Sequence, residues 1–288
     1  MGKGRVVLLV DNRKRDLLGA ALIAHHLQRL GIACFLEPLE AYRAVLAAHK
    51  PALVLFNHLL ASHLVHYSKR LHKMGVLTAV LPNEALLYNR EVLRFNAGRF
   101  HNEAHIDHYF CWHEALKGAL LETGFNESTT RISVVGVPRF DYYYPPWSQL
   151  FERLPEPAAG KQRILFCTNF ALVRFSTLPK SAADQFFAAW APRIAAYKDY
   201  WGCIQSVRQR REAISAYFLA LAETGRYEVI IRPHPGEDAG FYRAWLDTLP
   251  ANLRSSMRVD AKSTISQLIM ASAVTVAVET CTTTLESW

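Results

Sequence analysis

One stretch of the sequence places a guanidinium and an imidazole, separated by a proline, directly after an apolar run. It reads RPHPGED and covers residues 232–238. Ligands of open α/β sheets gather outside the carboxyl ends of the strands, so we expect Arg232 and His234 to point into a crevice there. Both side chains can donate hydrogen bonds to phosphate oxygens, and His234 is also a candidate catalytic group. The stretch predicts an anion-binding loop, or else a strand-end turn in which His234 caps backbone carbonyls.

A second stretch, ETCTTTLES, brings a carboxylate and several hydroxyls to the predicted start of a helix. Backbone N–H groups at a helix N-terminus form an anion site, and Thr280, Thr282 and Thr283 would add hydroxyl donors to it. Glu279 is placed to bind a ribose hydroxyl. The alternative is ordinary N-capping by threonine, which phosphate binding does not exclude because one residue can do both.

The stretch VVGVPRFD, residues 134–141, joins a predicted strand to a tight turn at Gly136 and then to Arg139. An arginine at the end of a first domain lies where a cleft between two sheets would open, and we count Arg139 among the ligand-binding candidates. Taken structurally, Gly-x-Pro indicates only a turn.

Two carboxylates are candidates for a general base, the group that takes the proton of an attacking hydroxyl. Glu84 lies in PNEALLY, directly after a predicted strand, and Asp11 ends the first predicted strand. A base must reach the hydroxyl and be tuned to accept its proton, which a carboxylate partly removed from water can do. Either residue could instead cap a helix or pair with Arg90 or Arg94.

A histidine cluster, HNEAHIDH, contains His101, His105 and His108. His101 and His105 would share one face of a helix, but the cluster lacks the His-Glu-x-x-His order of zinc proteases. We therefore expect no metal site.

The elements that must position these groups alternate between strands and helices. Apolar runs typical of buried strands cover 6–11, 33–36, 52–57, 76–82, 108–112 and 132–136, and then 163–169, 227–235 and 274–280. Helix-like periodicity covers 17–30, 39–49, 60–74, 114–123 and most of 182–224. The alternation predicts an α/β protein with two doubly wound parallel sheets. We expect one sheet in a domain at 1–144 and the other in a domain at 161–288, with a proline-rich linker at 145–160 between them. The strand and helix pattern of the second domain breaks off before it is complete.

Composition limits the class of protein. The chain has 288 residues, of which 51% are hydrophobic and 20% charged, and its five cysteines form no Cys-x-x-Cys pair. We find no apolar run of about 18 residues, so we expect a cytoplasmic protein with reduced thiols. The formal net charge of +8 favours anionic partners, among which nucleotides, lipid headgroups and nucleic acids are equally compatible with the sign.

Taken together, Gly-x-Pro-Arg-x-Asp, a strand followed by His-Pro and a strand ending in a threonine-rich helix start resemble the GT-B superfamily. The pattern is similar to that of CDP-glycerol glycerophosphotransferases and capsule-building transferases. The text LEPLEAYRAVLAA, VLTAVLPNEALLY, RFNAGRFHN and ETCTTTLESW more narrowly resembles surface carbohydrate biosynthesis proteins, over nearly the whole chain.

This resemblance implies two Rossmann-like domains, with the donor nucleotide mainly on the second and the acceptor mainly on the first. It implies a nucleotide-sugar or CDP-polyol donor as substrate, a carbohydrate or lipid-linked acceptor, no tightly bound cofactor and no nucleic acid. Peripheral contact with the inner membrane face is compatible with it. Two alternatives remain open, a sugar-nucleotide 2-epimerase of the same fold and a non-catalytic binding or scaffold protein of the polysaccharide machinery.

Overall fold

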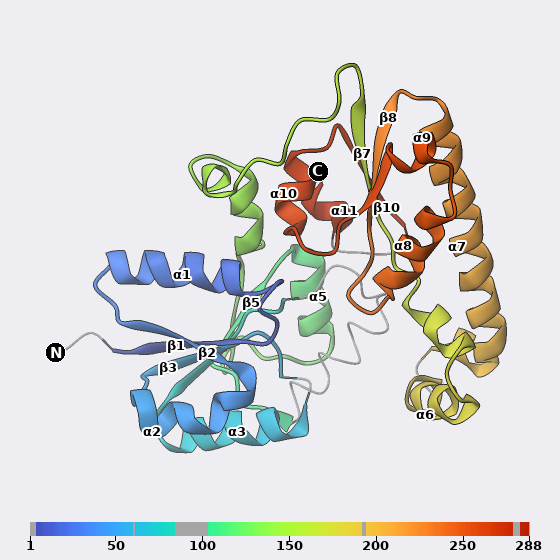
Figure 1. Ribbon diagram of the computed structural model, residues 1–288. Coiled ribbons are helices and arrows are strands. Elements are labelled where there is room, and N and C mark those ends of the chain that lie inside the picture. The colour runs from blue at the N-terminus through green and yellow to red at the C-terminus, as the bar shows by residue number, and fades with distance from the viewer. Residues whose placement is uncertain (1–3, 60, 84–102, 192–193, 279–282, 288) are drawn as a thin grey trace. The chain divides into compact units, whose positions relative to one another are not determined.

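The computed structural model describes residues 4–59, 61–83, 103–191, 194–278 and 283–287. The chain divides into two compact units, Met1–Tyr144 and Pro145–Trp288. Each unit is built on a parallel sheet with helices on both faces (Figure 1).

The described residues of the N-terminal unit form a sheet of six strands in the order β2-β1-β3-β4-β5-β6. The strands are β1 Val6–Val10, β2 Cys34–Pro38, β3 Leu53–Phe56, β4 Leu77–Val80, β5 His108–Cys111 and β6 Arg131–Val134. The helical segments are α1 Leu17–Arg29, η1 Leu39–Ala44, α2 Val45–His49, α3 Ser62–Lys73, α5 Glu114–Glu122 and η2 Pro138–Tyr143. All neighbouring strands are parallel, and the order changes direction between β1 and β3.

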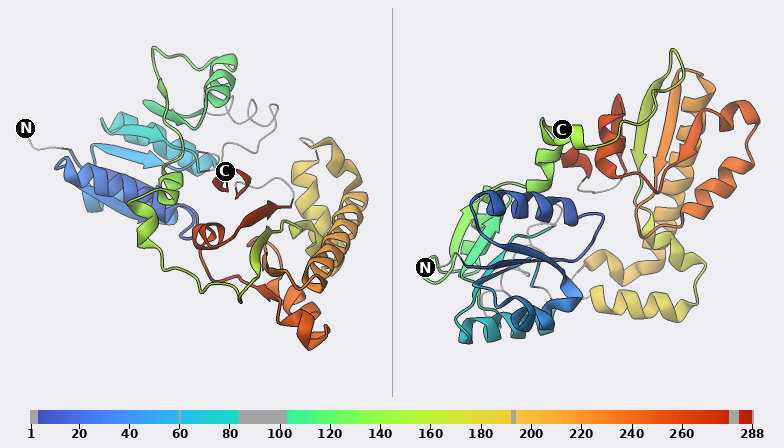
Figure 2. Two further views of the ribbon diagram at one scale, coloured as in Figure 1. Left: turned by 90° about the horizontal axis from the view of Figure 1, so that it is seen from above. Right: turned by 60° about the vertical axis from the view of Figure 1, so that its left-hand side comes forward.

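The two faces of β1 explain why its sequence is apolar throughout. Successive side chains of a strand point to opposite faces. Val7 and Leu9 join the large core under α2 and α3, whereas Leu8 packs with Ala24 of α1. Figure 1 and the right-hand view of Figure 2 show that α1 covers one face of this sheet and that α2 and α3 cover the other. A strand buried on both faces needs a continuous apolar run.

In the part of the C-terminal unit that the structure describes, four parallel strands form a sheet in the order β10-β7-β8-β9. They are β7 Gln162–Cys167, β8 Tyr227–Arg232, β9 Met257–Val259 and β10 Val274–Ala277. The helical segments are η3 Trp147–Leu150, η4 Ala171–Ser176, α6 Lys180–Trp190, η5 Ala195–Asp199, α7 Tyr200–Glu223, α8 Ala239–Asp247, α9 Ala251–Arg254, α10 Ile265–Met270 and α11 Thr283–Glu286.

The core of this unit follows the same alternation. Phe166 of β7 packs with Phe218 of α7 and Tyr242 of α8 on one face. Its neighbour Leu165 packs with Leu268 of α10 on the other face. Figure 1 shows α7 and α10 on opposite sides of β7 accordingly.

The predicted fold class is confirmed, and the differences are local. The single helix predicted at 39–49 is a 3-10 segment followed by a short α-helix. Residues three apart eclipse in a 3-10 helix, so Leu39 and Tyr42 both reach the core. Strand β9 and helix α10 were not predicted. Among the described residues, no helix is both long and apolar enough to cross a membrane.

Candidate ligand-binding sites at the carboxyl ends of the sheets

A small hollow lies at the carboxyl ends of the N-terminal strands. It is bordered by the residues that follow β1, β3, β4 and β6, and it contains about 70 Å³ of space open to water-sized molecules. Its polar lining consists of Arg15, Asp16, Asn57, Asn83 and Arg139. Asp16 and Asn57 follow the two strands between which the strand order changes direction, the position where α/β sheets bind ligands.

Asp16 is the centre of this polar lining. Its carboxylate accepts hydrogen bonds from Arg15 Nε at 2.6 Å, from the Asn12 backbone at 2.9 Å and from Asn83 Nδ2 at 3.2 Å. Asn57 Nδ2 lies 3.4 Å from the same carboxylate. Burial raises the pKa of Asp16, but Arg15 and the other donors lower it more, so the pKa lies below its ordinary value. Asp16 is therefore an anion that accepts hydrogen bonds at neutral pH.

Asn57 leaves one polar atom of the hollow unsatisfied. Its side chain is 7% exposed, and its Oδ1 has no hydrogen-bond partner among the described residues. An unpaired buried acceptor is costly, and such atoms in native proteins call for an explanation such as a ligand or a bound water. A hydroxyl that enters the hollow would satisfy Asn57 Oδ1.

Arg139, predicted as a ligand-binding residue, lies at this hollow. Its Nη1 donates to the Asn83 carbonyl at 2.9 Å, and its guanidinium lies 5.1 Å from the centre of the Trp112 ring. Gly19 of α1 lies next to Arg139, and a Cβ there would make ordinary van der Waals contact with Arg139 at 3.6 Å. Arg139 is thus held within the N-terminal unit by backbone and aromatic contacts.

The two predicted bases have different outcomes. Asp11 forms an ion pair with Arg15 at 3.0 Å and has 36% of its side chain exposed. It is not among the described residues that line the hollow. Glu84 lies outside the described residues, so its role stays a prediction. Sequence reasoning missed Asp16, Asn57 and Asn83, although Asn57 ends an apolar run in the same way that Asp11 does.

In the C-terminal unit, Glu237 organises the RPHPGED loop. It accepts from Thr168 Oγ1 at 2.8 Å, from the His234 backbone at 3.1 Å and from the Tyr242 hydroxyl at 2.8 Å. Burial and the Glu237 charge raise the pKa of Tyr242, which therefore stays a neutral donor. Because Thr168 follows β7 and His234 follows β8, these bonds fix the loop to the carboxyl ends of two adjacent strands.

His234 is exposed at the tip of this loop, and its tautomer is determined by the backbone. Its Nδ1 accepts the N–H of Gly236 at 3.0 Å. The ring proton of the neutral form is therefore on Nε2, which can donate a hydrogen bond to a phosphate or hydroxyl oxygen.

Arg232, predicted to bind phosphate, also makes a structural hydrogen bond within the C-terminal unit. It is half-buried, and its Nη1 donates to the Asp260 carbonyl at 2.9 Å. Burial lowers its pKa, although an arginine remains protonated in proteins. Arg232 therefore links the end of β8 to the residue after β9, and its removal would affect this link as well as any ligand.

The remaining predicted residues are only partly described. Glu279, Thr280 and Thr282 lie outside the described residues, and their role stays a prediction. Thr283 is the first residue of α11 and is buried.

Of the histidine cluster, the structure describes His105 and His108, and neither lies in a helix. His101 lies outside the described residues. His108 bonds Ser133 at 3.0 Å and stacks on Phe110, and burial followed by the Arg131 charge lowers its pKa. His105 turns instead to Asp107.

Comparisons with known proteins establish the fold. No protein-family model and no curated protein matches the sequence. The chain is similar to a UDP-GlcNAc 2-epimerase from Neisseria meningitidis, solved with UDP-GlcNAc, at a TM-score of 0.51 and 12% identity over 95% of this chain and 77% of that one. The fold is therefore α/β of the GT-B type.

Two further solved structures are similar at TM-scores below 0.5. One is described as a UDP-N-acetylglucosamine 2-epimerase from Listeria monocytogenes, with a TM-score of 0.49 and 13% identity over 96% of this chain and 75% of that one. The other is HepE from Anabaena in complex with UDP and glucose, with a TM-score of 0.45 and 12% identity over 94% and 73%.

Proposed function

We propose that the protein is a nucleotide-sugar enzyme that transfers a sugar or a polyol phosphate from an activated nucleotide donor to an acceptor in bacterial surface polysaccharide biosynthesis. One observation carries the proposal: His234 is exposed at the carboxyl end of β8 with its proton directed to Nε2 by the Gly236 N–H. The GT-B type of fold and the resemblance of the sequence motifs support the same class of enzyme.

The donor would bind to the C-terminal unit through its phosphates. When the bond between the transferred group and the leaving phosphate oxygen breaks, negative charge develops on that oxygen. A preorganised donor such as His234 Nε2 stabilises the developing charge, and Arg232 would add a positive charge nearby. The Glu237 hydrogen bonds keep the loop in place before the donor arrives, so little reorganisation is needed.

The acceptor would bind to the N-terminal unit. Asn57 Oδ1 and the Asp16 carboxylate are acceptors for hydroxyl groups, which a carbohydrate offers in number. The hydroxyl-bearing part of a sugar would enter the hollow, which Asp16 and Asn57 line. The oxygen of the attacking hydroxyl forms the new bond, and its proton passes to Glu84 or Asp11.

A thermal-shift panel of CMP, CDP, UDP and GDP tests the nucleotide part of the proposal. A nucleotide present at 100 times its Kd stabilises the fold by about 2.7 kcal/mol, which we expect for at least one of the four. His234→Ala should weaken that nucleotide by roughly 10- to 100-fold, since a hydrogen bond to a charged group contributes about 1.5–3 kcal/mol. Arg254→Ala, at an exposed arginine of α9, is the control and should bind normally. If no nucleotide shifts the melting temperature, the scaffold alternative is favoured; if His234→Ala binds like the wild type, His234 is wrongly assigned.

The second candidate is a sugar-nucleotide 2-epimerase, and the likeness to the Neisseria meningitidis epimerase favours it. The two reactions differ in their need for an acceptor. Incubation with an isotopically labelled nucleotide sugar and no acceptor should leave the sugar unchanged. The appearance of its 2-epimer under these conditions would replace the transferase proposal.

A further inference from the structure

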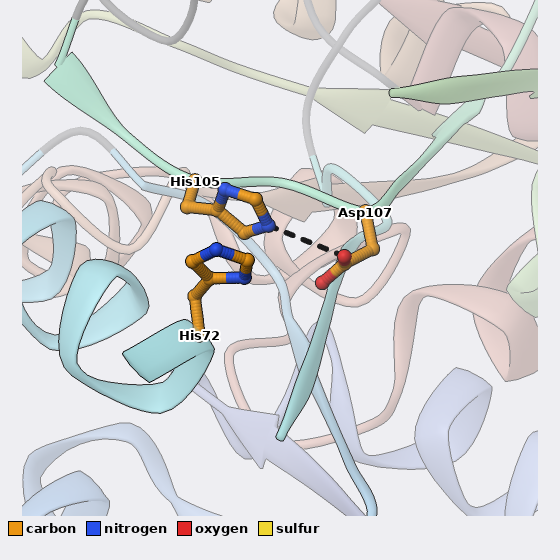
Figure 3. A group of neighbouring side chains, drawn as sticks. All are labelled: His72, His105 and Asp107. Carbon is orange, nitrogen blue, oxygen red and sulfur yellow. Dashed lines mark hydrogen bonds and ion pairs between the residues drawn. The ribbon is translucent and has the colours of Figure 1, made fainter. Parts of the chain in front are cut away.

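Three side chains of metal-binding type meet at the end of the N-terminal sheet opposite to the hollow. His72 is in the last turn of α3, and His105 and Asp107 directly precede β5. One ligand atom from each of the three lies within 4.8 Å of the other two. Figure 3 shows that both imidazole rings turn a nitrogen toward the Asp107 carboxylate. We propose that His72, His105 and Asp107 bind one divalent transition-metal ion of the zinc type.

The ligand atoms of His105 and Asp107 already lie at about the distance from each other that two ligands of one metal ion have. His105 and Asp107 are two residues apart in the segment before β5, and their side chains face each other. The distance from His105 Nε2 to Asp107 Oδ1 is 3.2 Å. In a tetrahedral zinc site with bonds of about 2.0–2.2 Å, neighbouring ligand atoms are about 3.4 Å apart. A metal ion could therefore replace this hydrogen bond with little movement.

Buried polar groups hold these two ligands from behind. Thr78 donates to Asp107 Oδ2 through its backbone at 2.7 Å and through its hydroxyl at 3.1 Å. The Thr78 hydroxyl also lies 2.8 Å from the His105 carbonyl, and the His105 N–H donates to Ser68 Oγ at 3.2 Å. Thr78 and Ser68 are both fully buried. Outer hydrogen bonds of this kind orient metal ligands, and donors on a carboxylate favour its charged, metal-binding form.

His72 is the ligand that must move. Its ring is stacked on that of His105, with centroids 3.5 Å apart and planes inclined by 24°. A metal ion lies near the plane of each imidazole that binds it, so the stack has to open. His72 is exposed at the end of its helix and can rotate about its side-chain bonds.

The ligand set selects the class of metal. Two imidazole nitrogens and one carboxylate oxygen suit zinc and similar first-row ions, whereas calcium and magnesium prefer oxygen ligands alone. Three protein ligands leave a fourth tetrahedral position for water. The C-terminal end of α3 adds a favourable field, because helix carbonyls there carry partial negative charge.

The position of the group separates it from the proposed nucleotide-sugar chemistry. Thr78 is in the first half of β4 and Asp107 directly precedes β5, so the group lies at the amino ends of these strands. Asp16 and Asn57 follow the carboxyl ends of β1 and β3. A metal ion bound by His72, His105 and Asp107 would link the end of α3 to the start of β5. Its binding would not depend on a nucleotide.

Calorimetry with zinc chloride on the tag-free, chelator-treated full-length protein tests the proposal. We expect one zinc ion per chain, and a rise in melting temperature that EDTA reverses. His72→Ala should weaken binding by more than about 100-fold, because losing even an outer partner of a ligand costs about 10- to 100-fold. Cobalt(II) should give the visible absorption of a four-coordinate site in the wild type only.

His66→Ala is the matched control, because His66 is an exposed histidine of the same helix outside the group. This variant should bind zinc as the wild type does. His72→Ala removes an exposed side chain, so it tests the site without disturbing the Thr78 and Ser68 contacts. Absence of saturable zinc binding to the wild type, or equal binding by His72→Ala, would overturn the proposal.

Discussion

Replacing Tyr242 by phenylalanine should destabilise the C-terminal unit by about 2 kcal/mol. The ring is 1% exposed and its packing against Phe166 and Phe218 is kept in the variant. Only the hydroxyl is lost, and with it the 2.8 Å bond to Glu237 Oε2. A hydrogen bond to a charged group contributes about 1.5–3 kcal/mol, and about 2 kcal/mol corresponds to a roughly 30-fold change in the unfolding equilibrium.

Urea unfolding of the full-length protein measures this loss, and hydrogen exchange of β8 peptides assigns it to the C-terminal unit. Tyr217→Phe is the control: Tyr217 is 52% exposed, and the change should stay within about 0.5 kcal/mol. A double-mutant cycle with Glu237→Gln should show coupling of about 1–2 kcal/mol, because the two residues share one bond. A loss for Tyr242→Phe no larger than that of the control would refute the assignment of Glu237 as the organiser of the loop.

Two further predictions concern the N-terminal unit. Gly136→Ala should destabilise this unit by about 1–2 kcal/mol, because Gly136 has a φ of +78°, where a residue with a Cβ is strained. No atom lies within 4 Å of the added Cβ, so backbone strain is the only cost. Gly118→Ala, inside α5 and equally open, is the control and should be neutral or stabilising in the same urea assay. Asp16→Asn should reveal a pH-dependent contribution. The pKa of Asp16 is lowered in the fold, so its contribution is present above the unfolded pKa of about 4 and is lost as pH falls through the folded pKa. The stability difference between wild type and Asp16→Asn should therefore shrink below about pH 4, and a constant difference from pH 7 to 2.5 would contradict this.

The sequence was sufficient for the elements that are buried on both faces. Strand β1 is a continuous apolar run, and β7 carries the apolar run Ile164 to Cys167 after Gln162 and Arg163. Such runs are typical of strands buried on both faces of a parallel sheet. Strand β9 has only three residues and α10 only six, too few to show a period. The segment 39–49 is helical as predicted, but its first part, Leu39–Ala44, is a 3-10 helix, whose spacing the same pattern also fits.

The candidate site was predicted only where one stretch of sequence carries it. The RPHPGED loop is continuous, so Arg232 and His234 could be named. Asn83 is 67 residues from Asp16, and their contact follows from strand order, which no local pattern contains. His105 was compared with His101 at helical spacing, whereas its observed partner Asp107 is two residues away in a non-helical segment.

The electrostatics of the hollow bear on which group takes the proton in the proposed transfer. A general base works best when its pKa lies near the working pH. The pKa of Asp16 is shifted the other way, which suits Asp16 to holding a hydroxyl and not to deprotonating it. Asp11 is engaged by Arg15, the same guanidinium that bonds Asp16. Glu84 directly follows Asn83, whose amide reaches Asp16. Of the two predicted bases, the structure describes only Asp11, which is paired with Arg15, and the role of Glu84 as the base stays a prediction.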